Sequence, residues 1–371
     1  MRKISIITER RADFSRFLPI IKNIEKDDEL EYSLIVTGNH LLKNHGYTKN
    51  EILQSGIKID FEFKMFDEES ADSTRSMSEA LGRAIIQLPK IIESQKPDLI
   101  LSGFDIAANL AITIVGAHMN IPVFHIQGGE VTGTIDESIR HAMSKFAHYH
   151  FAANEDACDR LIKLGELPSH VFNVGCPSID ALLSVKNSPK ILKELEINKP
   201  YFLVLQHPVT TEFKKTEKHF IETIKALRAF PSHDKIFILP NNDAGYSNIV
   251  RLIEENDLKY IRSLSIDNYV NLLRRADALI GNSSSGIHET PTFNVPTVNI
   301  GTRQNARMRS NNVFDATYSE KSIIKAINLA QQWKGSEAQK IYGLGDSASR
   351  IIEIMKKADI SDKIIQKQIT Y

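Results

Sequence analysis

The stretch "PDLILSGFDIAANLAITIVGAHMNIPVFHIQGGE", residues 97–130, decides the fold class. Two short apolar runs, "PDLILSG" (97–103) and "PVFHIQG" (122–128), flank a segment with a helix-like composition. Runs of about four to eight residues that are rich in Ile, Val and Leu and bounded by Gly or Pro are typical of buried strands. A strand, helix and strand in this order predict a parallel sheet that is covered by helices on both faces.

The same alternation continues on both sides of this stretch. The other apolar runs are "KISIIT" (3–8), "YSLIVTG" (32–38), "YFLVLQH" (201–207), "KIFILP" (235–240), "DALIGN" (277–282) and "PTVNIG" (296–301). The pattern breaks over residues 184–200, which are polar, contain proline and lack a buried-strand signature. We therefore predict an α/β protein with two doubly wound, Rossmann-like domains, residues 1–183 and 184–355, that face each other across a cleft.

Composition limits the kinds of partner. A chain of 371 residues is long enough for two domains, and its 46 Lys and Arg residues balance its 46 Asp and Glu residues. This balance indicates neither a nucleic-acid nor a membrane-surface partner. The opening "MRKISIITERRADF" has too short an apolar run for a signal peptide or a membrane span. Cys158 and Cys176 are far apart, which fits a reducing cytoplasm and predicts a cytoplasmic protein.

The sequence has neither GxGxxG after its first strand nor GxxxxGK[ST], so a bound nucleotide would need another phosphate cradle, and the second half supplies a candidate. In "DALIGNSSSGIHE" (277–289), a strand ends at Gly281 and serines, including Ser283 and Ser284, follow where a helix begins. Backbone N–H groups and hydroxyls would converge there on a diphosphate. The alternative is that Asn282 or Ser283 simply caps the helix.

Charged residues near strand ends extend this prediction. Glu289 can accept hydrogen bonds from ribose hydroxyls, and Arg303 follows the next strand and can pair with phosphate. Near the front, one of Arg10 and Arg11 is expected to clamp phosphate from the opposite domain. The alternative is that Asp13 caps a helix that begins at the next residue and that both arginines are solvated.

Four acids gather after strands of the first half. Asp105 follows "PDLILSG" and Glu130 follows "PVFHIQG", so their loops are expected to be neighbours at one sheet edge. Asp136 and Glu137 open the segment "DESIRHAMSKFAHY" (136–149), where an acid in the first helical turn is also an ordinary capping preference. Even if two of these acids only cap, enough remain for acid and base roles.

Histidines give one further candidate. His207 ends the first strand of the second half, where it can donate to phosphate or transfer a proton near neutral pH, although a structural role is equally open. His141, His148 and His150 have spacings of seven and two residues, which do not align them on one helix face. We therefore predict no metal site.

Eight motifs in order give the chain a family resemblance. They are "TERRADF", "VTGNHLL", "HIQGGEVTGTIDESIRH", "GCPSID", "QHP", "LPNNDAG", "IGNSSSGIHE" and "NIGTRQ". Together they resemble the hydrolysing UDP-N-acetylglucosamine 2-epimerases of sialic acid and related nonulosonic acid biosynthesis, from about residue 4 to residue 351. The resemblance implies the GT-B architecture, UDP on the second domain, the amino sugar in the cleft, and no metal or nicotinamide cofactor. It also implies a homodimer or homotetramer, and we expect a helix in residues 356–371 to cross back to the N-terminal domain.

The resemblance also assigns site residues. The diphosphate would be bound by Arg11, Arg303, Ser283 and Ser284, and the ribose by Glu289. The sugar or phosphate would be contacted by His207 with support from Asn241, and further substrate contacts would come from His40, Gln127 and Gly286. The acidic positions of the family would be Asp105, Asp136 and Glu137.

Two positions depart from the family pattern. "GFDI" inserts Phe104 before Asp105 and lacks an arginine that relatives often have next to that acid. Relatives in sialic acid synthesis can carry a carboxylate where this chain has Gln127. If that carboxylate is their base, this chain must use Glu130 or another acid, or Gln127 only positions the sugar.

The implied reaction explains the dense carboxylates. UDP leaves C1 and a proton leaves C2 to give a glycal, and water then adds at C1 while a proton returns to the opposite face of C2. This chemistry needs a base, an acid and anions near C1. Our hypothesis is that Asp105 and either Glu130 or Glu137 are the acid/base pair and that Asp136 stabilises charge.

Four alternatives stay open. They are the same reaction on UDP-2,4-diacetamido-2,4,6-trideoxyglucose, a non-hydrolysing epimerase, a GT-B glycosyltransferase, and a nucleotide-sugar-binding regulator without turnover. The acidic cluster argues against the last of these.

Overall fold

The structure is a computed structural model that describes residues 1–67, 73–240, 243–333 and 335–370. Contacts divide the chain into two compact units. The first unit comprises Met1–Glu130, Asp136–Ala181 and Tyr342–Tyr371, and the second comprises Val131–Ile135 and Leu182–Ile341. The sequence-based boundaries were residues 183 and 355, so the structure groups the chain after Tyr342 with the first unit. Asp180 explains this grouping, because its carboxylate accepts from the backbone N–H groups of Ser347 and Ala348 (3.2 and 2.9 Å).

The first unit contains a seven-stranded parallel sheet among its described residues. Its strands are β1 (Arg2–Thr8), β2 (Leu30–Val36), β3 (Phe61–Glu62), β4 (Leu99–Gly103), β5 (Val123–Ile126), β6 (Tyr149–Ala152) and β7 (Val171–Asn173). They lie in the order β3-β2-β1-β4-β5-β6-β7, and every neighbouring pair is parallel. The two runs of the opening stretch form β4 and β5, which confirms the predicted parallel sheet.

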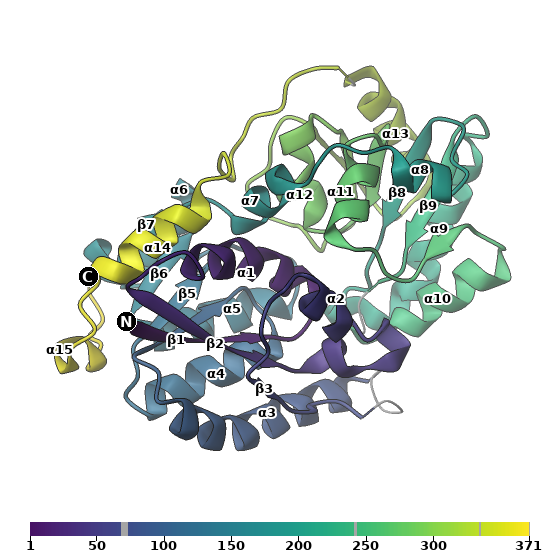
Figure 1. Ribbon diagram of the computed structural model, residues 1–371. Coiled ribbons are helices and arrows are strands. Elements are labelled where there is room, and N and C mark those ends of the chain that lie inside the picture. The colour runs from purple at the N-terminus through teal and green to yellow at the C-terminus, as the bar shows by residue number, and fades with distance from the viewer. Residues whose placement is uncertain (68–72, 241–242, 334, 371) are drawn as a thin grey trace. The chain divides into compact units, whose positions relative to one another are not determined.

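Helices cover both faces of this sheet. The helices of this unit are α1 (Arg11–Ile24), α2 (Lys49–Gln54), α3 (Thr74–Gln95), α4 (Ala107–His118), α5 (Ile135–Phe146), α6 (Glu155–Lys163), α14 (Ser347–Lys357) and α15 (Asp362–Ile365), with single 3-10 turns at Gly38–Leu41, Lys43–His45 and Pro168–His170. Helix α7 (Pro177–Ser184) begins in this unit and ends in the second. Ile6 packs with α1 and α14, and the adjacent Ile7 packs with α3 and α4. Successive strand residues face opposite sides, so the continuous apolar runs fill two cores. Figure 1 shows α14 lying beside α1.

The second unit repeats this plan with a six-stranded parallel sheet among its described residues. Its strands are β8 (Tyr201–Leu205), β9 (Asp234–Ile238), β10 (Tyr260–Ile261), β11 (Ala278–Gly281), β12 (Thr297–Ile300) and β13 (Val313–Ala316), in the order β10-β9-β8-β11-β12-β13. Its helices are α8 (Lys190–Glu194), α9 (Thr216–Arg228), α10 (Tyr246–Glu255), α11 (Ile266–Leu273), α12 (Ser285–His288) and α13 (Glu320–Trp333), with 3-10 segments at Thr210–Lys215 and Thr290–Phe293. The predicted break over residues 184–200 contains α8 and no strand.

Strand order locates the functional edge of each sheet. The order reverses between β1 and β4 in the first unit and between β8 and β11 in the second. In sheets of this kind ligands bind beyond the carboxyl ends of the strands at that reversal. These ends are followed by Arg10 and Asp105 in one unit and by His207 and Asn282 in the other. None of the helices in the described part of the chain is long and apolar enough to cross a membrane.

Candidate functional site

The loops after β4 and β5 have an unusual backbone. Phe104 (φ 70°) and Gln127 (φ 59°) both adopt the left-handed backbone conformation, which residues other than glycine seldom adopt. The Phe104 ring is buried against Phe17, with ring centroids 5.1 Å apart. Burial of this ring explains how the loop accommodates Phe104 before Asp105. Strain of this kind persists where the surroundings enforce it, and it concentrates at functional sites.

Arg140 links the two loops. Its side chain is 2% exposed, and its guanidinium donates to the carboxylate of Asp105 and to the backbone carbonyl of Glu130 (2.9 Å). Asp105 itself is 21% exposed, so its carboxylate is accessible while one oxygen is held. None of the sequence motifs points to Arg140 as a contact residue. Its position on α5, one helical turn after Asp136 and Glu137, was the available signal.

Gln127 lies between an arginine and an acid. Its side-chain oxygen accepts from Arg16 (3.0 Å), and its amide nitrogen is 3.5 Å from the buried carboxylate of Glu130. The Arg16 guanidinium also stacks 4.9 Å above the Phe104 ring. Arg16 was likewise not predicted, because it lies in the middle of α1. Gln127, where some relatives carry a carboxylate, therefore contacts both the cation Arg16 and the acid Glu130.

The remaining two acids lie in the first turn of α5. Asp136 and Glu137 are both half-buried, and Glu137 is 4.0 Å from His141. Burial, with the nearby charge of Arg140, lowers the pKa of His141. The structure thus places the four predicted acids on the loops after β4 and β5 and at the start of the next helix.

The arginines after β1 have different surroundings. Arg10 pairs with buried Glu9 (3.0 Å), and Glu9 also accepts from the backbone N–H of Ala108 (2.9 Å). Asp13 accepts from the backbone N–H groups of Glu9 and Arg10 (2.9 and 2.8 Å). The helix therefore begins at Arg11, earlier than expected, because Asp13 folds back from its first turn. Burial lowers the pKa of Arg11, and the charge of Glu51 opposes this shift.

His40 is enclosed by hydroxyl groups. Its Nε2 lies 3.0 Å from Thr8 Oγ1 and its Nδ1 lies 2.7 Å from Thr48 Oγ1. Burial and the charge of Arg11 lower the pKa of His40 to about 3, so the ring is neutral. Both ring nitrogens are occupied within the protein, and substrate contact by His40 stays a prediction.

Asn282 organises the sheet edge of the second unit. Its side chain accepts from the backbone N–H of His207 (2.7 Å) and donates to the His207 carbonyl (2.9 Å). Its own carbonyl accepts from Arg303 (3.1 Å) and Gln304 (2.8 Å). The sequence leaves open a helix-capping role for Asn282, but Ser284 precedes α12, and Asn282 joins the ends of β8, β11 and β12. This arrangement holds the predicted His207 and Arg303 beside the serine loop.

The helix after β11 is shorter than expected. α12 spans only Ser285–His288, because Pro291 has no backbone N–H with which to continue the helical hydrogen bonds, and a 3-10 turn follows. Glu289 directly follows α12, and its carboxylate accepts from Ser285 Oγ (2.6 Å) and Tyr269 (3.2 Å). The Tyr269 hydroxyl also bonds Ser285.

Gly286 of this loop packs against β12, whereas Ser283 and Ser284 lie at the start of α12. A Cβ atom at Gly286 would lie 2.5 Å from the Thr297 side chain, so this glycine permits close packing of α12 against β12. The Ser283 hydroxyl accepts from the backbone N–H of Ser285 (3.3 Å), and Ser284 is the residue before α12. UDP contacts by all three residues remain predictions.

The loop of Arg303 is fixed from several directions. Thr302 donates to Glu212 (2.9 Å), and the Arg303 carbonyl accepts from the backbone N–H of Gly133 (3.0 Å). Gly133 has no room for a side chain, since a Cβ there would lie 1.9 Å from the Thr302 carbonyl. The predicted Asn241 lies outside the described residues. Among the described residues there is no group of three His, Cys, Asp or Glu side chains suited to a metal ion.

Comparisons with known proteins agree with this arrangement. The family model described as UDP-N-acetylglucosamine 2-epimerase matches residues 22–356. The chain is 33% identical over 381 residues to the UDP-N,N'-diacetylbacillosamine 2-epimerase (hydrolyzing) of Legionella pneumophila, covering 100% of both chains. It is also 33% identical over 382 residues to the UDP-N-acetylglucosamine 2-epimerase of Neisseria meningitidis, covering 99% of this chain and 98% of that protein.

Solved structures show the same fold. The Neisseria meningitidis UDP-GlcNAc 2-epimerase bound to UDP-GlcNAc aligns with a TM-score of 0.80 at 18% identity, over 96% of this chain and 100% of that chain. The Methanocaldococcus jannaschii enzyme in complex with UDP-GlcNAc and UDP aligns with a TM-score of 0.79 at 20% identity, over 96% and 100% of the two chains. The predicted GT-B-like pair of Rossmann-like domains is confirmed. The chain belongs to the UDP-N-acetylglucosamine 2-epimerase family and is a UDP-sugar 2-epimerase.

Proposed function

We propose that the protein is a hydrolysing 2-epimerase that converts UDP-N-acetylglucosamine and water into N-acetylmannosamine and UDP, for sialic acid biosynthesis. The observation that carries this proposal is the set of acids in the first unit, of which Asp105 and the backbone of Glu130 are held by buried Arg140. A reaction that removes and returns a proton at one carbon needs both a base and an acid. Several carboxyl groups in one site can meet that need.

The first step is elimination. A carboxylate accepts the proton from C2, the C1–O bond breaks with its electron pair passing to UDP, and a C1=C2 double bond forms. In the second step a carboxyl group delivers a proton to the opposite face of C2 while a water oxygen bonds C1. The proton that this water loses passes to the resulting carboxylate, and the proton taken from C2 in the first step is released to solvent. Asp105 and either Glu130 or Glu137 are the proposed acid/base pair, and Asp136 stabilises the positive charge that develops at C1.

The second unit supplies the proposed UDP contacts. Arg303, Ser283 and Ser284 would bind the diphosphate, together with Arg11 of the first unit. Glu289 would accept from the ribose hydroxyls, and its fixed position supports this role because Tyr269 and Ser285 already orient its carboxylate. His207 would donate to phosphate or sugar, with Asn282 holding its backbone.

A second sugar is a specific alternative. Two relatives, from Legionella pneumophila and Campylobacter jejuni, are named as hydrolysing epimerases of diacetylbacillosamine linked to a nucleotide. That UDP-sugar is UDP-2,4-diacetamido-2,4,6-trideoxyglucose, which differs at C4 and C6. The Arg16–Gln127 pair is the observation that keeps this alternative, since an amide and a guanidinium can both bind an acetamido group.

A parallel assay decides between the two sugars. The protein is incubated with each UDP-sugar separately, without metal or acceptor, and UDP release is followed over time. We expect the higher kcat/KM with UDP-N-acetylglucosamine and N-acetylmannosamine as the second product. A higher kcat/KM with the diacetamido sugar would assign the alternative substrate. Formation of UDP-N-acetylmannosamine would reject the hydrolysing reaction. A cytoplasmic location and a homodimer or homotetramer remain predictions.

A further inference from the structure

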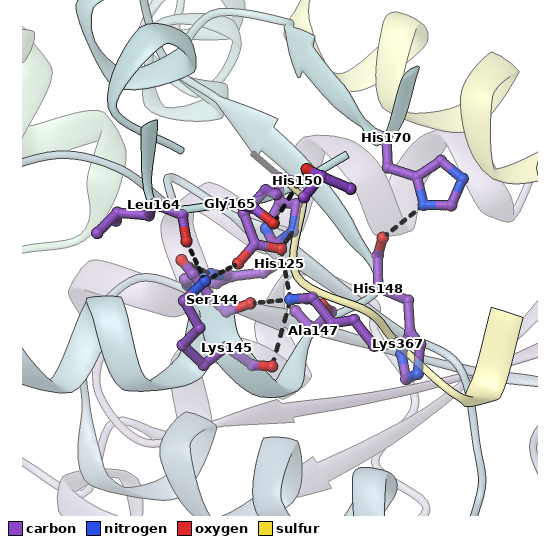
Figure 2. Close-up of polar contacts among 12 residues, drawn as sticks. His125, Ser144, Lys145, Ala147, His148, His150, Leu164, Gly165, His170 and Lys367 are labelled. Carbon is purple, nitrogen blue, oxygen red and sulfur yellow. Dashed lines mark hydrogen bonds and ion pairs between the residues drawn. The ribbon is translucent and has the colours of Figure 1, made fainter. Parts of the chain in front are cut away.

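The C-terminal tail after α14 is bound by residues that are more than 200 positions away in the sequence. The Lys367 ammonium donates to the backbone carbonyls of Ser144 (2.6 Å), Ala147 (2.7 Å) and Lys145 (3.2 Å). These carbonyls belong to the end of α5, and Ser144 is 223 residues away along the chain. Figure 2 shows the Lys367 side chain pointing at the Ser144 and Ala147 carbonyls. An ammonium with three donors matches a helix end, where the last carbonyls lack helical partners and carry partial negative charge.

A buried acid completes this anchor. Glu166, whose side chain is 1% exposed, pairs with Lys367 and Lys145 (2.8 Å to Lys145) and accepts from His150 Nε2 (2.9 Å). Burial alone would raise the pKa of Glu166, but the hydrogen bond from His150 and the two lysines outweigh it and lower that pKa to about 2. We call Lys367, Glu166, Lys145 and His150 the α5 clamp. The clamp joins the tail, the end of α5, strand β6 and the loop after α6.

The rest of the tail supports the same docking. The backbone N–H of Thr370 donates to the Gly165 carbonyl (2.9 Å), and His148 Nε2 lies 3.4 Å from the Ile365 carbonyl. A Cβ atom at Gly165 would lie 2.3 Å from the Ile369 side chain, so Gly165 permits this close approach. The tail is therefore held at several points on the surface of the first unit.

A short chain of contacts connects the clamp to the acids. Ser144, whose carbonyl binds Lys367, donates its hydroxyl to the Arg140 carbonyl (3.1 Å) one helical turn earlier. Arg140 in turn holds Asp105. Ser144 Oγ also lies 3.2 Å from His125 Nδ1, and His125 Nε2 lies 3.3 Å from the carbonyl of Phe104, the residue before Asp105. Both routes lead from the helix end to the loop that carries Asp105.

From these contacts we infer that Lys367 is a positioning residue, which holds α5 in the register that aligns Arg140 and the acids of the first unit for proton transfer. This inference rests on the proposed function for its catalytic consequence. A misplacement of about 1 Å in a catalytic site can cost about 10²-fold in rate, so a small shift or fraying of α5 is sufficient. UDP binding should be spared, because most of its proposed contacts lie in the second unit.

The test compares Lys367→Met with Lys363→Met, which changes an exposed lysine of the same tail. Lys367→Met is expected to lower kcat about 10-fold or more, while KM and the Kd for UDP stay within about 3-fold of wild type. Hydrogen exchange measured by mass spectrometry should become faster in the peptide that contains residues 135–146. Lys363→Met should leave kcat and exchange unchanged. Equal kcat in the two variants, or unchanged exchange of α5, would overturn the inference.

Two further variants separate positioning from general stability. Tyr149→Phe removes the hydroxyl that donates to the Asp359 carbonyl (2.9 Å), which loosens the tail away from α5. It is expected to lower the melting temperature but not kcat; a kcat loss equal to that of Lys367→Met would show a merely structural effect.

If Lys367→Met does not fold, Lys367→Arg is compared in its place, since arginine keeps the charge but cannot donate to three carbonyls from one atom. If the wild type releases UDP from neither sugar, the proposed function fails, and hydrogen exchange alone decides the clamp.

Discussion

Arg140 contacts two of the four acidic residues that the sequence predicts for the site of the first unit. It is almost completely buried, yet it contacts an accessible carboxylate and the backbone of a second acid. A buried guanidinium costs free energy unless its charge is paired, and the Asp105 carboxylate and the Glu130 carbonyl bind its two terminal nitrogens. The contact between Arg140 and Asp105 therefore has two effects: the carboxylate compensates the buried charge of Arg140, and Arg140 fixes the position of the carboxylate.

Replacement of Asp105 by Asn tests its chemical role. An amide keeps the shape of the side chain but cannot accept or deliver the proton, so kcat should fall about 10²-fold or more. The Kd for UDP, measured by calorimetry, should stay close to wild type. Asp98→Asn, at the opposite end of β4, is the matched control and should retain full activity. A wild-type kcat for Asp105→Asn would exclude an acid/base role.

Replacement of Arg140 by Met tests the positioning role. Loss of a buried charge partner is expected to cost about 3 kcal/mol in the free energy of unfolding and to lower kcat as well. Arg75→Met, which removes an exposed ion pair with Glu79, should leave the free energy of unfolding close to that of wild type. Urea unfolding and steady-state kinetics measure both effects. An Arg140→Met enzyme with normal kcat would show that the acids align without it.

At this scale the sequence identified residue types better than residue partnerships. Asp105 and Glu130 could be proposed because each follows an apolar run, and Glu289 because it lies about one to two turns into the segment after the serines. Arg140, Arg16 and Asn282 were missed as contact residues, since their roles depend on which loops meet in space. A lone Asn after a strand reads as a cap, and only the structure shows that Asn282 holds His207.

Strand ends are the elements that create the site. In the second unit, β8, β11 and β12 end side by side, and Asn282 joins the three following loops. Gly281 (φ 141°) makes this approach possible, because a Cβ there would lie 1.9 Å from the Leu205 carbonyl. The close contact of two strand ends thus needs glycine at this position.

Asn282→Ala tests this arrangement. The variant loses two hydrogen bonds to the His207 backbone, each worth about 1 kcal/mol, and we expect the Kd for UDP to rise about 10-fold. Asn299→Ala is the control, because Asn299 is a buried asparagine on β12 that bonds Asp315 (2.7 Å) instead. Calorimetric titration with UDP measures both. Equal Kd values for the two variants would contradict the role of Asn282.

Strands were easier to predict than helix ends. The apolar runs located β4, β5, β8 and β11, because buried parallel strands need continuous hydrophobic sequence. The start of α1 and the length of α12 were not predicted, since Asp13 folds back on the chain and Pro291 ends the α conformation early.

Buried histidines set the response of the whole molecule to pH. Burial, as the largest cause, lowers the pKa of His125 to about 3, of His40 to about 3 and of His150 to about 4, from 6.5. Below pH 6.5 the unfolded chain binds protons that these folded histidines do not, so stability is lost as pH falls from 6.5 toward 3. Burial raises the pKa of Asp13 to about 7, which acts in the opposite direction between pH 3.8 and 7.

The three histidines lower stability on acidification and the Asp13 carboxyl raises it, so we predict a net loss of stability as pH falls. The midpoint of urea unfolding, measured at constant ionic strength, should fall steadily from pH 7 to pH 4. A midpoint that is constant or rises over this range would contradict the neutral state assigned to the buried histidines.

The two units share one order over six strands, to which the first unit adds β7 at its edge, and each unit supplies a different part of the proposed chemistry. The parallel α/β class and the division into two units could be predicted from the repeated apolar runs. The return of the chain after Tyr342 to the first unit could not be placed by composition, because it depends on the capping of α14 by Asp180. The α5 clamp at Lys367 could not be predicted from composition either, since its partners are distant in sequence.

The measurement that tests the central claim most directly is the reaction of UDP-N-acetylglucosamine in D₂O, followed by proton NMR without metal or acceptor. We predict free UDP and N-acetylmannosamine that carries deuterium at C2, because the proton removed in elimination is replaced from solvent. Unchanged substrate, or N-acetylmannosamine that retains its C2 proton, would contradict hydrolysing epimerisation through these carboxylates.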